Sequence, residues 1–276
     1  MARGRIKNTL RKIHLNKAEG RGRCYKGVYK PGIYTYEFPS KGKTARIKVL
    51  TSERVHHCLS QHEKYFFMLL DYDPTVSEIF EQYFLSLEAT LLIAAEQGIP
   101  HPYANQCPAQ MSTDFLYCMN GKWYAVAIKT TEDLKKKRTR EKLEIERLYW
   151  EKKGIPWRIV TEKDIPRQKA LNLYWLHSGE SLDKLIPDAT TRENLVAAVQ
   201  ELYQNYAVPF HRMVEEIETL CHLRNGTVLQ IFKHLVKSNI ISIDINKPIN
   251  TVEPRTFSWL ESQISSNKGD HYGGVF

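Results

Sequence analysis

The stretch that constrains this chain most is residues 112–129, STDFLYCMNGKWYAVAIK. Two apolar runs meet at Asn120-Gly121, the dipeptide most typical of a two-residue β-hairpin loop with a type I′ turn. If these two residues form the loop, Asp114 on the first strand opposes Ala127 on the second. Side chains alternate between the faces of a sheet, so Lys129 shares the face of Asp114 as its diagonal neighbour, about 7 to 8 Å away at the backbone. The hairpin thus predicts an acid and a base on one face.

The spacing of Asp114 and Lys129 predicts a shared ligand rather than a direct contact. We expect about 7 to 8 Å to be too wide for the hairpin to close a salt bridge by itself. The same distance suits a metal ion on the aspartate and a phosphate between the ion and the lysine. Phosphodiester hydrolysis needs such an arrangement, because a divalent ion held by carboxylates polarises the phosphate and lowers the pKa of a water. The two residues are therefore candidate catalytic groups.

Segments on both sides of the hairpin predict an α/β core with a mixed sheet. Helices are expected from Ser60 to about residue 70, over residues 86–98, and after the hairpin up to Gly154. The third helix is long, so its basic middle is expected to hold a kink or a loop. Residues 157–160 then form a strand, and residues 32–58 carry the pattern of short strands and turns. Helix, strand, strand, helix, strand is an order typical of an α/β core.

Glu63 has two explanations. Ser60 followed three residues later by a glutamate is a capping box, in which both side chains satisfy backbone N–H groups at the start of a helix. A catalytic role is the other explanation of this glutamate. Spacing alone favours the cap.

From about residue 188 the pattern changes to helices. Residues 192–206, 210–223 and 227–239 are expected to be helical, and the last has apolar positions at i, i+3, i+4, i+7 and i+8. Its other face is expected to present Lys233 and Lys237. A strand-like run and a turn follow, which completes the order of a winged helix. Such modules bind DNA or dock proteins, and both roles stay open.

With 276 residues the chain is long enough for two domains. We expect a basic arm and an α/β core over residues 1–175, and a mainly helical, winged-helix-like domain with a tail over residues 176–276. The tail, residues 268–276, has the glycines of a disordered segment and the aromatic residues of a partner-binding peptide.

Positive charge is concentrated near the start of the chain. The formal net charge is +9, from 40 lysines and arginines against 31 aspartates and glutamates. Residues 1–30 hold ten basic residues, Arg21 and Arg23 among them, and one acid, Glu19. Such an arm points to a polyanion, whose phosphates it would neutralise with release of counterions. A solvated tail and an arginine-rich transit peptide are the alternatives.

A second basic run follows the hairpin. It would need no partner as a solvated helix face, whereas its position just after Lys129 favours contact with a DNA backbone. Its basic members are Lys135, Lys136, Lys137, Arg138 and Arg140.

The five cysteines are scattered, with no C-x-x-C pair, which suits a reducing compartment and free thiols. Cys58 and His62 lie four residues apart, but no second Cys/His pair stands at a zinc-site spacing. No apolar run approaches the length of a membrane span. These features predict a cytoplasmic protein without a membrane partner.

Over most of its length the chain resembles the TnsA family, the endonuclease subunits of heteromeric cut-and-paste transposases. The likeness runs in order from the arm to about residue 165, and it implies a restriction-endonuclease-like fold. The matching stretches are Glu19-Gly20-Arg21-Gly22, Arg54-Val55-His56-His57, Leu59-Ser60, Glu63, Glu81-Gln82, His101-Pro102, Met111-Ser112-Thr113-Asp114-Phe115-Leu116, Glu141-Lys142-Leu143-Glu144 and Ile155-Pro156-Trp157.

The resemblance implies a role for three residues. Glu63 and Asp114 match the glutamate and aspartate with which the family binds Mg²⁺, for which Mn²⁺ is an expected substitute. Lys129 matches the lysine of the family's (E/Q)-x-K strand. Enzymes of this family cut the non-transferred (5′) strand of double-stranded DNA at transposon ends. The implied partners are a TnsB-type transposase and a TnsC-type AAA+ regulator, which binds the C-terminal part, and the implied location is the bacterial cytoplasm.

Ala127 departs from the family pattern, which has Glu or Gln two residues before the lysine. Because the alanine opposes Asp114, the metal is expected to lack one polar ligand. Three accounts stay open: a natural variation that manages with backbone carbonyls and water, an engineered substitution, or a catalytically retired subunit. Mg²⁺ keeps several waters readily, so the loss of one ligand need not abolish binding. The main hypothesis is an Mg-dependent DNA endonuclease, and the alternative is a disabled subunit that bridges DNA and assembles the complex.

Overall fold

The computed structural model describes residues 10–25, 27–37, 43–48, 54–178, 181–205, 210–238, 240–249 and 257–259. The tail over residues 268–276 lies outside the described residues. The chain divides into two compact units, residues 1–170 and 171–276, and each is described here by itself. This division and the expected boundary at about residue 175 both fall inside helix α6 (Arg167–His177). Within the described residues, no helix combines the length and the apolar composition that crossing a bilayer requires.

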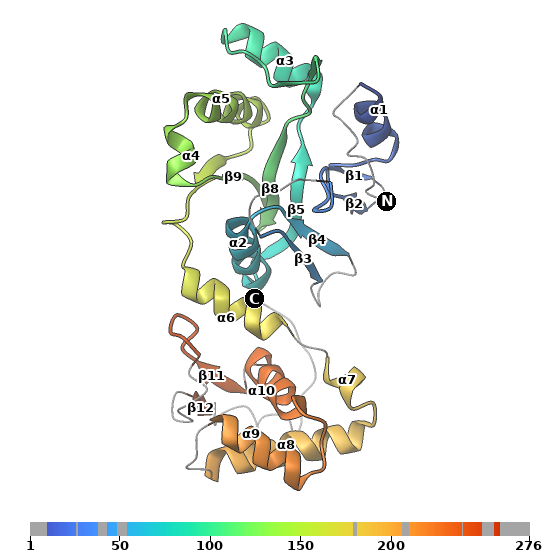
Figure 1. Cartoon of the computed structure of the whole chain (residues 1–276), viewed down its shortest axis with the longest axis vertical. Helices are drawn as coiled ribbons and strands as arrows, with labels where there is room; N and C mark the ends of the chain where they lie inside the picture. Colours follow the sequence, from blue (N-terminus) through green and yellow to red (C-terminus); the bar gives the residue numbers. More distant parts are fainter. Residues whose placement is uncertain are drawn as a thin grey trace. The chain divides into compact units, whose positions relative to one another are not determined.

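A mixed four-stranded sheet forms the centre of the first unit (Figure 1). Its strands stand in the order β10 (Trp157–Val160), β9 (Lys122–Ile128), β8 (Ser112–Met119) and β5 (Val76–Phe84). β10 runs parallel to β9, and the other pairs are antiparallel. The predicted mixed sheet is therefore confirmed, with β8 as an inner strand.

The β8–β9 hairpin has the register that its turn sequence predicts. Met119 opposes Lys122, and Phe115 opposes Val126. Asn120 and Gly121 have φ angles of 50° and 73°, the left-handed values that both central residues of a type I′ turn require. The Asn120-Gly121 turn thus determines which residues of β8 and β9 lie opposite each other.

Helices cover the two faces of the sheet. α2 (Gln61–Tyr72) packs Phe66 and Phe67 against Phe115 of β8, with ring centroids 5.7 and 6.4 Å apart. On the other side, α5 (Lys137–Lys152) buries its apolar residues in a cluster with Leu116 of β8. Adjacent residues of β8 thus serve opposite layers, as strand alternation requires.

Predicted helix ends agree with the structure. α3 (Leu87–Glu96) begins after Ser86, whose hydroxyl accepts from the Ala89 N–H. The long helix after the hairpin is interrupted at Lys136, which separates α4 (Thr131–Lys135) from α5. The remaining elements of the unit are α1 (Leu10–Ala18), β1 (Arg23–Tyr25), β2 (Val28–Lys30), β3 (Ala45–Lys48), β4 (Val55–Cys58), β6 (Tyr103–Ala104) and β7 (Cys107–Pro108).

β5 is a strand of the central sheet that the sequence pattern did not predict. Its sequence, VSEIFEQYF, places Glu81 and Gln82 at buried positions, so it lacks the apolar alternation by which strands are recognised. The strand nevertheless pairs with β8 along most of its length, Phe80 with Leu116 and Phe84 with Ser112. The site therefore receives residues that sequence periodicity does not reveal.

In the second unit, a helical region precedes a pair of antiparallel strands, as the sequence predicts. Phe210 and Met213 of α9 pack with Ile231 and Phe232 of α10 in one buried core. The elements after α6 are α7 (Leu182–Leu185), α8 (Ala189–Asn205), α9 (Phe210–Leu220), α10 (Thr227–Lys237), β11 (Ile241–Ile243) and β12 (Phe257–Trp259).

Candidate active site

Asp114 and Lys129 form a direct ion pair. Lys129 Nζ lies 2.7 Å from Asp114 Oδ2, and the same oxygen accepts from the backbone N–H of Ile128 at 2.6 Å. The expectation that the hairpin is too wide to close this salt bridge is wrong. The side chain of lysine is long enough to cover a cross-strand diagonal. In addition, the paired ladder ends at Phe115 and Val126, and the Asp114 carboxylate takes the next N–H group of β9.

Glu63 forms only half of a capping box at the start of α2, and its carboxylate bonds a backbone N–H group outside that box. The Ser60 hydroxyl accepts from the Glu63 N–H at 3.1 Å, which is the first half of a capping box. The second half is missing: Glu63 Oε2 accepts from the Leu59 N–H at 2.8 Å, one residue before the cap. The Glu63 side chain is only 6% exposed. The two explanations of Glu63 are thus geometrically compatible.

The side-chain amide of Gln82 contacts both Glu63 and Asp114. Its Nε2 atom lies 3.2 Å from Glu63 Oε2 and 3.5 Å from Asp114 Oδ1, the second distance being at the upper limit of hydrogen bonding. Burial, and next the negative charge of Asp114, raise the pKa of Glu63 to about 7. Two neighbouring carboxylates repel each other, and a divalent cation between them would relieve that repulsion. Carboxylate oxygens are ligands that Mg²⁺ accepts. Glu63 and Asp114 therefore fit a metal ion.

A buried ionic cluster holds the strand that carries Gln82. Glu81 is fully buried, and its carboxylate accepts from both terminal nitrogens of Arg54, at 2.7 and 2.8 Å. His56 Nδ1 lies 3.1 Å from the same carboxylate, and the His57 N–H donates to it at 3.2 Å. Burial would raise the pKa of Glu81, but His56 and Arg54 outweigh it and lower that pKa. The cluster joins β4 to β5 beside the two acids.

Comparisons with known proteins identify the family of this chain. A family model described as TnsA-like endonuclease N terminal matches residues 73–162, and one described as TnsA endonuclease C terminal matches residues 164–245. The chain is also 34% identical over 253 residues to the Transposon Tn7 transposition protein TnsA of Escherichia coli, across 86% of this chain and 92% of that protein. The chain belongs to the TnsA endonuclease family. It accordingly has the restriction-endonuclease-like α/β fold and the role of a transposition nuclease.

The matched ranges of the TnsA models cover part of the site. Gln82, Asp114 and Lys129 lie inside residues 73–162, whereas Glu63 precedes both matched ranges. The place of Glu63 in this TnsA-family site therefore rests on the geometry, above all on the amide of Gln82 that contacts both acids.

Glu146 is a buried acid that sequence analysis missed. It lies on α5, its carboxylate accepts from the Thr113 hydroxyl, and it accepts from Trp157 Nε1 at 3.1 Å. Burial, and next the charge of Asp114, raise the pKa of Glu146 to about 7. Burial alone would lower the pKa of Lys129, but Asp114 and Glu146 outweigh it and raise that pKa. The spacing of Glu146 from Leu143 and Tyr149 places it on the buried stripe of the helix, and this spacing could have revealed the buried acid in the sequence.

Two of the residues expected to contact DNA are buried in this TnsA-family chain, which corrects the expectation. Arg21 is 7% exposed, and its guanidinium pairs with Glu37 and donates to Asn16 Oδ1 at 3.0 Å. Lys233 is 4% exposed and donates to the Ser178 carbonyl at 2.6 Å, with its Nζ 4.6 Å from the centre of the Trp175 ring. Both cations are bonded to groups of their own unit.

The other expected DNA contacts remain accessible. Arg23 and Lys237 are exposed. Lys135 and Lys136 are exposed and pair with Glu132 and Asp133, each at 2.7 Å. Exposed pairs of this kind contribute little to stability, so they leave the lysines available to phosphate.

The arginines of the same run are engaged by backbone carbonyls. Arg140 donates to the carbonyls of Leu134 and Lys135, at 3.1 and 2.8 Å, which satisfies the end of α4. Arg138 donates to the Pro100 carbonyl at 2.6 Å. Lys137 is exposed, with Glu141 at 3.9 Å. Lys135, Lys136 and Lys137 are thus the exposed lysines of the run, whereas Arg140 is exposed but bonded to backbone carbonyls.

Ala127 is fully buried and presents only a methyl group to the site. Among the residues that the structure describes, no group of three or more histidines, cysteines, aspartates or glutamates could hold a metal ion. Position 127 thus offers no polar side chain to a metal ion at Glu63 and Asp114.

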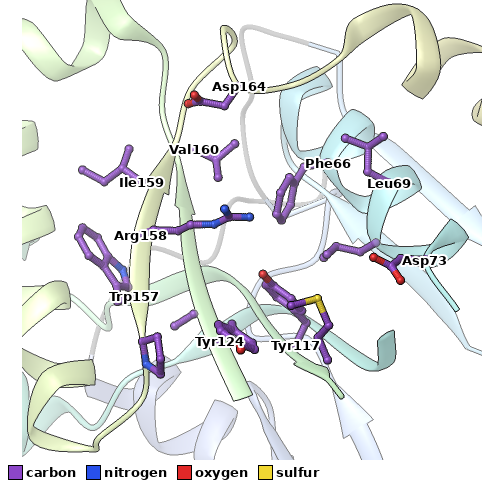
Figure 2. A pocket seen from close by; sticks show the side chains of 14 residues that line it. Phe66, Leu69, Asp73, Tyr117, Tyr124, Trp157, Arg158, Ile159, Val160 and Asp164 are labelled. Atoms are coloured by element: carbon purple, nitrogen blue, oxygen red, sulfur yellow. The ribbon is translucent and has the colours of Figure 1, made fainter. Parts of the chain in front are cut away.

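A separate hollow of about 560 Å³ lies between α2 and β10. Figure 2 shows Arg158 extending from β10 towards Phe66, with Tyr117 and Tyr124 nearby. Its carboxylates, Asp73 and Asp164, stand apart from each other in this view (Figure 2). The hollow thus lacks the converging acids that the Glu63 and Asp114 site has.

Proposed function

We propose that this endonuclease hydrolyses the non-transferred (5′) strand of double-stranded DNA at transposon ends, with Mg²⁺ as cofactor and Mn²⁺ as a substitute. The observation that carries the proposal is the meeting of Glu63, Asp114 and Lys129 at one point. Glu63 and Asp114 would hold the ion, which supplies a polarised phosphate and a water of lowered pKa. In the transposition complex, this cut would separate the element from its donor DNA.

Lys129 acts as a fixed positive charge in this proposal. Its raised pKa keeps the ammonium protonated at neutral pH in the free protein. In the free protein the ammonium neutralises Asp114. With DNA bound, the same group is in reach of the scissile phosphate and stabilises the charge that develops on it.

DNA and protein partners complete the proposed complex. The exposed Lys135, Lys136 and Lys137 follow Lys129 closely in the chain and would hold the DNA backbone, with Arg23 and Lys237 as further contacts. The partners would be a TnsB-type transposase and a TnsC-type regulator docked on the C-terminal part. We also propose the domain division at about residue 175, with a winged-helix-like module after it.

The buried methyl group of Ala127 favours one alternative function. In it, the chain is a catalytically disabled subunit that bridges DNA and assembles the complex. The alternative keeps DNA and partner binding and removes strand cutting.

Strand-specific cleavage separates the two functions. A transposon-end duplex labelled on each strand is incubated with a TnsB-type partner and Mg²⁺ or Mn²⁺. We expect the chain to cut the 5′ strand and Asp114→Ala to leave it intact while DNA binding persists. Cleavage by Ala127→Gln alone would establish the disabled subunit, and cleavage by none of the three would refute the nuclease proposal for this site.

A further inference from the structure

Asp114 has two neighbours across the sheet, and they differ in chemistry. On the β9 side, the paired ladder ends at Phe115 and Val126, and continuing its register by one residue places Asp114 opposite Ala127. On the β5 side, the pairs Glu81 with Phe115 and Tyr83 with Thr113 enclose Gln82 opposite Asp114. One neighbour is a methyl group, and the other is a carboxamide.

The backbone of Gln82 is held in an unusual conformation. Its φ angle is 52°, a left-handed value that few non-glycine residues adopt inside a strand. Such a conformation is unfavourable and persists only where the surroundings enforce it. Here the Gly32 N–H donates to the Gln82 carbonyl at 2.9 Å, and the side chain is 2% exposed. The structure thus maintains strain that aims this amide at the two acids.

The amide of Gln82 has suitable partners in either orientation. Its Nε2 atom faces Glu63 and Asp114, and its Oε1 atom accepts from the Ser112 hydroxyl at 3.2 Å. A hydroxyl group donates or accepts equally well. The carboxamide can therefore turn over, with Ser112 accepting from Nε2 and the amide oxygen facing the acids.

We propose that Gln82 supplies the polar ligand that position 127 lacks. Without metal, its NH₂ group holds Glu63 and Asp114 together, and with a cation between those acids its oxygen becomes the third protein ligand. Amide oxygen is a ligand type that divalent hard cations accept. The third protein ligand thus comes from β5, on one side of Asp114, and not from β9, on the other side. This inference rests on the proposed metal site of Glu63 and Asp114.

Metal affinity of the full chain without DNA tests the inference. Mn²⁺ binding is measured by calorimetry or electron paramagnetic resonance for the unmodified chain, Gln82→Met and Gln82→Glu. Methionine keeps the length of the side chain and removes the amide, so we expect affinity to fall about tenfold or more. Glutamate cannot donate to the two acids but can bind a cation, so we expect affinity equal to or tighter than that of the unmodified chain. A residue that only positions the acids would give the opposite result for Gln82→Glu.

Matched variants separate failure of this inference from failure of the proposed function. Gln110→Met removes an amide that bonds the Leu85 carbonyl instead of the acids, and it should leave the affinity unchanged. Asp114→Ala should abolish binding, and unaltered binding would refute the metal site itself. If Asp114→Ala loses Mn²⁺ while Gln82→Met retains it, the role of Gln82 alone is overturned. Metal-free thermal unfolding checks each fold, and should Gln82→Met not fold, weakened binding by a folded Gln82→Glu overturns the inference.

Discussion

Lys129 serves two opposing purposes at the residue scale. Its ammonium neutralises Asp114 and so competes with a metal ion for that carboxylate, yet its charge is what a scissile phosphate needs. We predict that Lys129→Met lowers strand cleavage by about 10²- to 10³-fold and leaves Mn²⁺ affinity unchanged or tighter. Cleavage rates and metal titrations measure the two effects. Lys122→Met, at the exposed hairpin turn, is the control, and weaker Mn²⁺ binding by Lys129→Met would instead assign the lysine a structural role.

Glu146 makes stability depend on pH. Its carboxyl group has an ordinary pKa of 4.5 and a pKa of about 7 in the folded chain. Folding therefore favours the protonated form, and this contribution is present below pH 4.5 and lost as pH rises to about 7. Above that pH, the ionised group opposes folding by up to about 3 kcal/mol.

We predict that Glu146→Gln, which keeps an acceptor oxygen for Thr113 and Trp157, is more stable than the unmodified chain above pH 7. The two chains should be nearly equal near pH 4.5. Urea unfolding between pH 4.5 and 8, in the presence of a chelator, measures the difference. A difference that does not grow with pH would contradict the assignment.

At the scale of elements, β5 is positioned by the N-terminal segment. The Tyr29 hydroxyl donates to the Glu81 carbonyl at 2.7 Å, and the Gly32 N–H donates to the Gln82 carbonyl. A Cβ atom on Gly32 would come within 2.6 Å of that carbonyl and 2.5 Å of the Phe84 ring. The backbone of β5 can only move away from such an intrusion.

We therefore predict that Gly32→Ala destabilises the fold by about 1–3 kcal/mol and also weakens Mn²⁺ binding. Gly121→Ala is the matched control, because its Cβ would meet nothing within 4 Å and its cost comes only from a φ of 73°. That control should lose about 1 kcal/mol and keep its metal affinity. Equal metal affinity in the two variants would show that the N-terminal segment does not position Gln82.

At the scale of the whole molecule, net charge does not identify the DNA surface. Arg21 and Lys233 add to the +9 total yet are held by partners inside their own units, whereas Lys135, Lys136 and Lys137 are exposed. We predict that replacing these three lysines by glutamine reduces DNA affinity and lowers the slope of log K against log salt by about one unit per lost phosphate contact. Fluorescence anisotropy at several salt concentrations measures the slope.

An equal loss of charge elsewhere is the control for that experiment. Glutamine at Lys122, Lys152 and Lys163 removes three exposed charges away from the α4–α5 junction. Its salt slope should stay near that of the unmodified chain. Equal slopes for the two triple variants would refute the assignment of the basic run to the DNA backbone.

Several features of the molecule could be predicted from short stretches of sequence. The Asn120-Gly121 turn set the register of the hairpin, because left-handed φ angles at two consecutive residues are accessible to very few pairs. Ser60 and Ser86 marked helix starts through hydroxyl groups that accept the next turn's N–H groups. These signals act within a few residues and need no distant partner.

The sequence by itself therefore determined the hairpin, the helix caps, the mixed α/β order and, through family likeness, the three candidate catalytic residues. Only the tertiary structure decided that Gln82 meets Glu63 and Asp114, and that Arg21 and Lys233 turn inward. Backbone stereochemistry is local, so sequence shows it directly. The burial of a polar side chain depends on which distant strand supplies its partner. β5 pairs with β8 across about thirty residues of sequence, and it has no apolar pattern from which this pairing could be predicted.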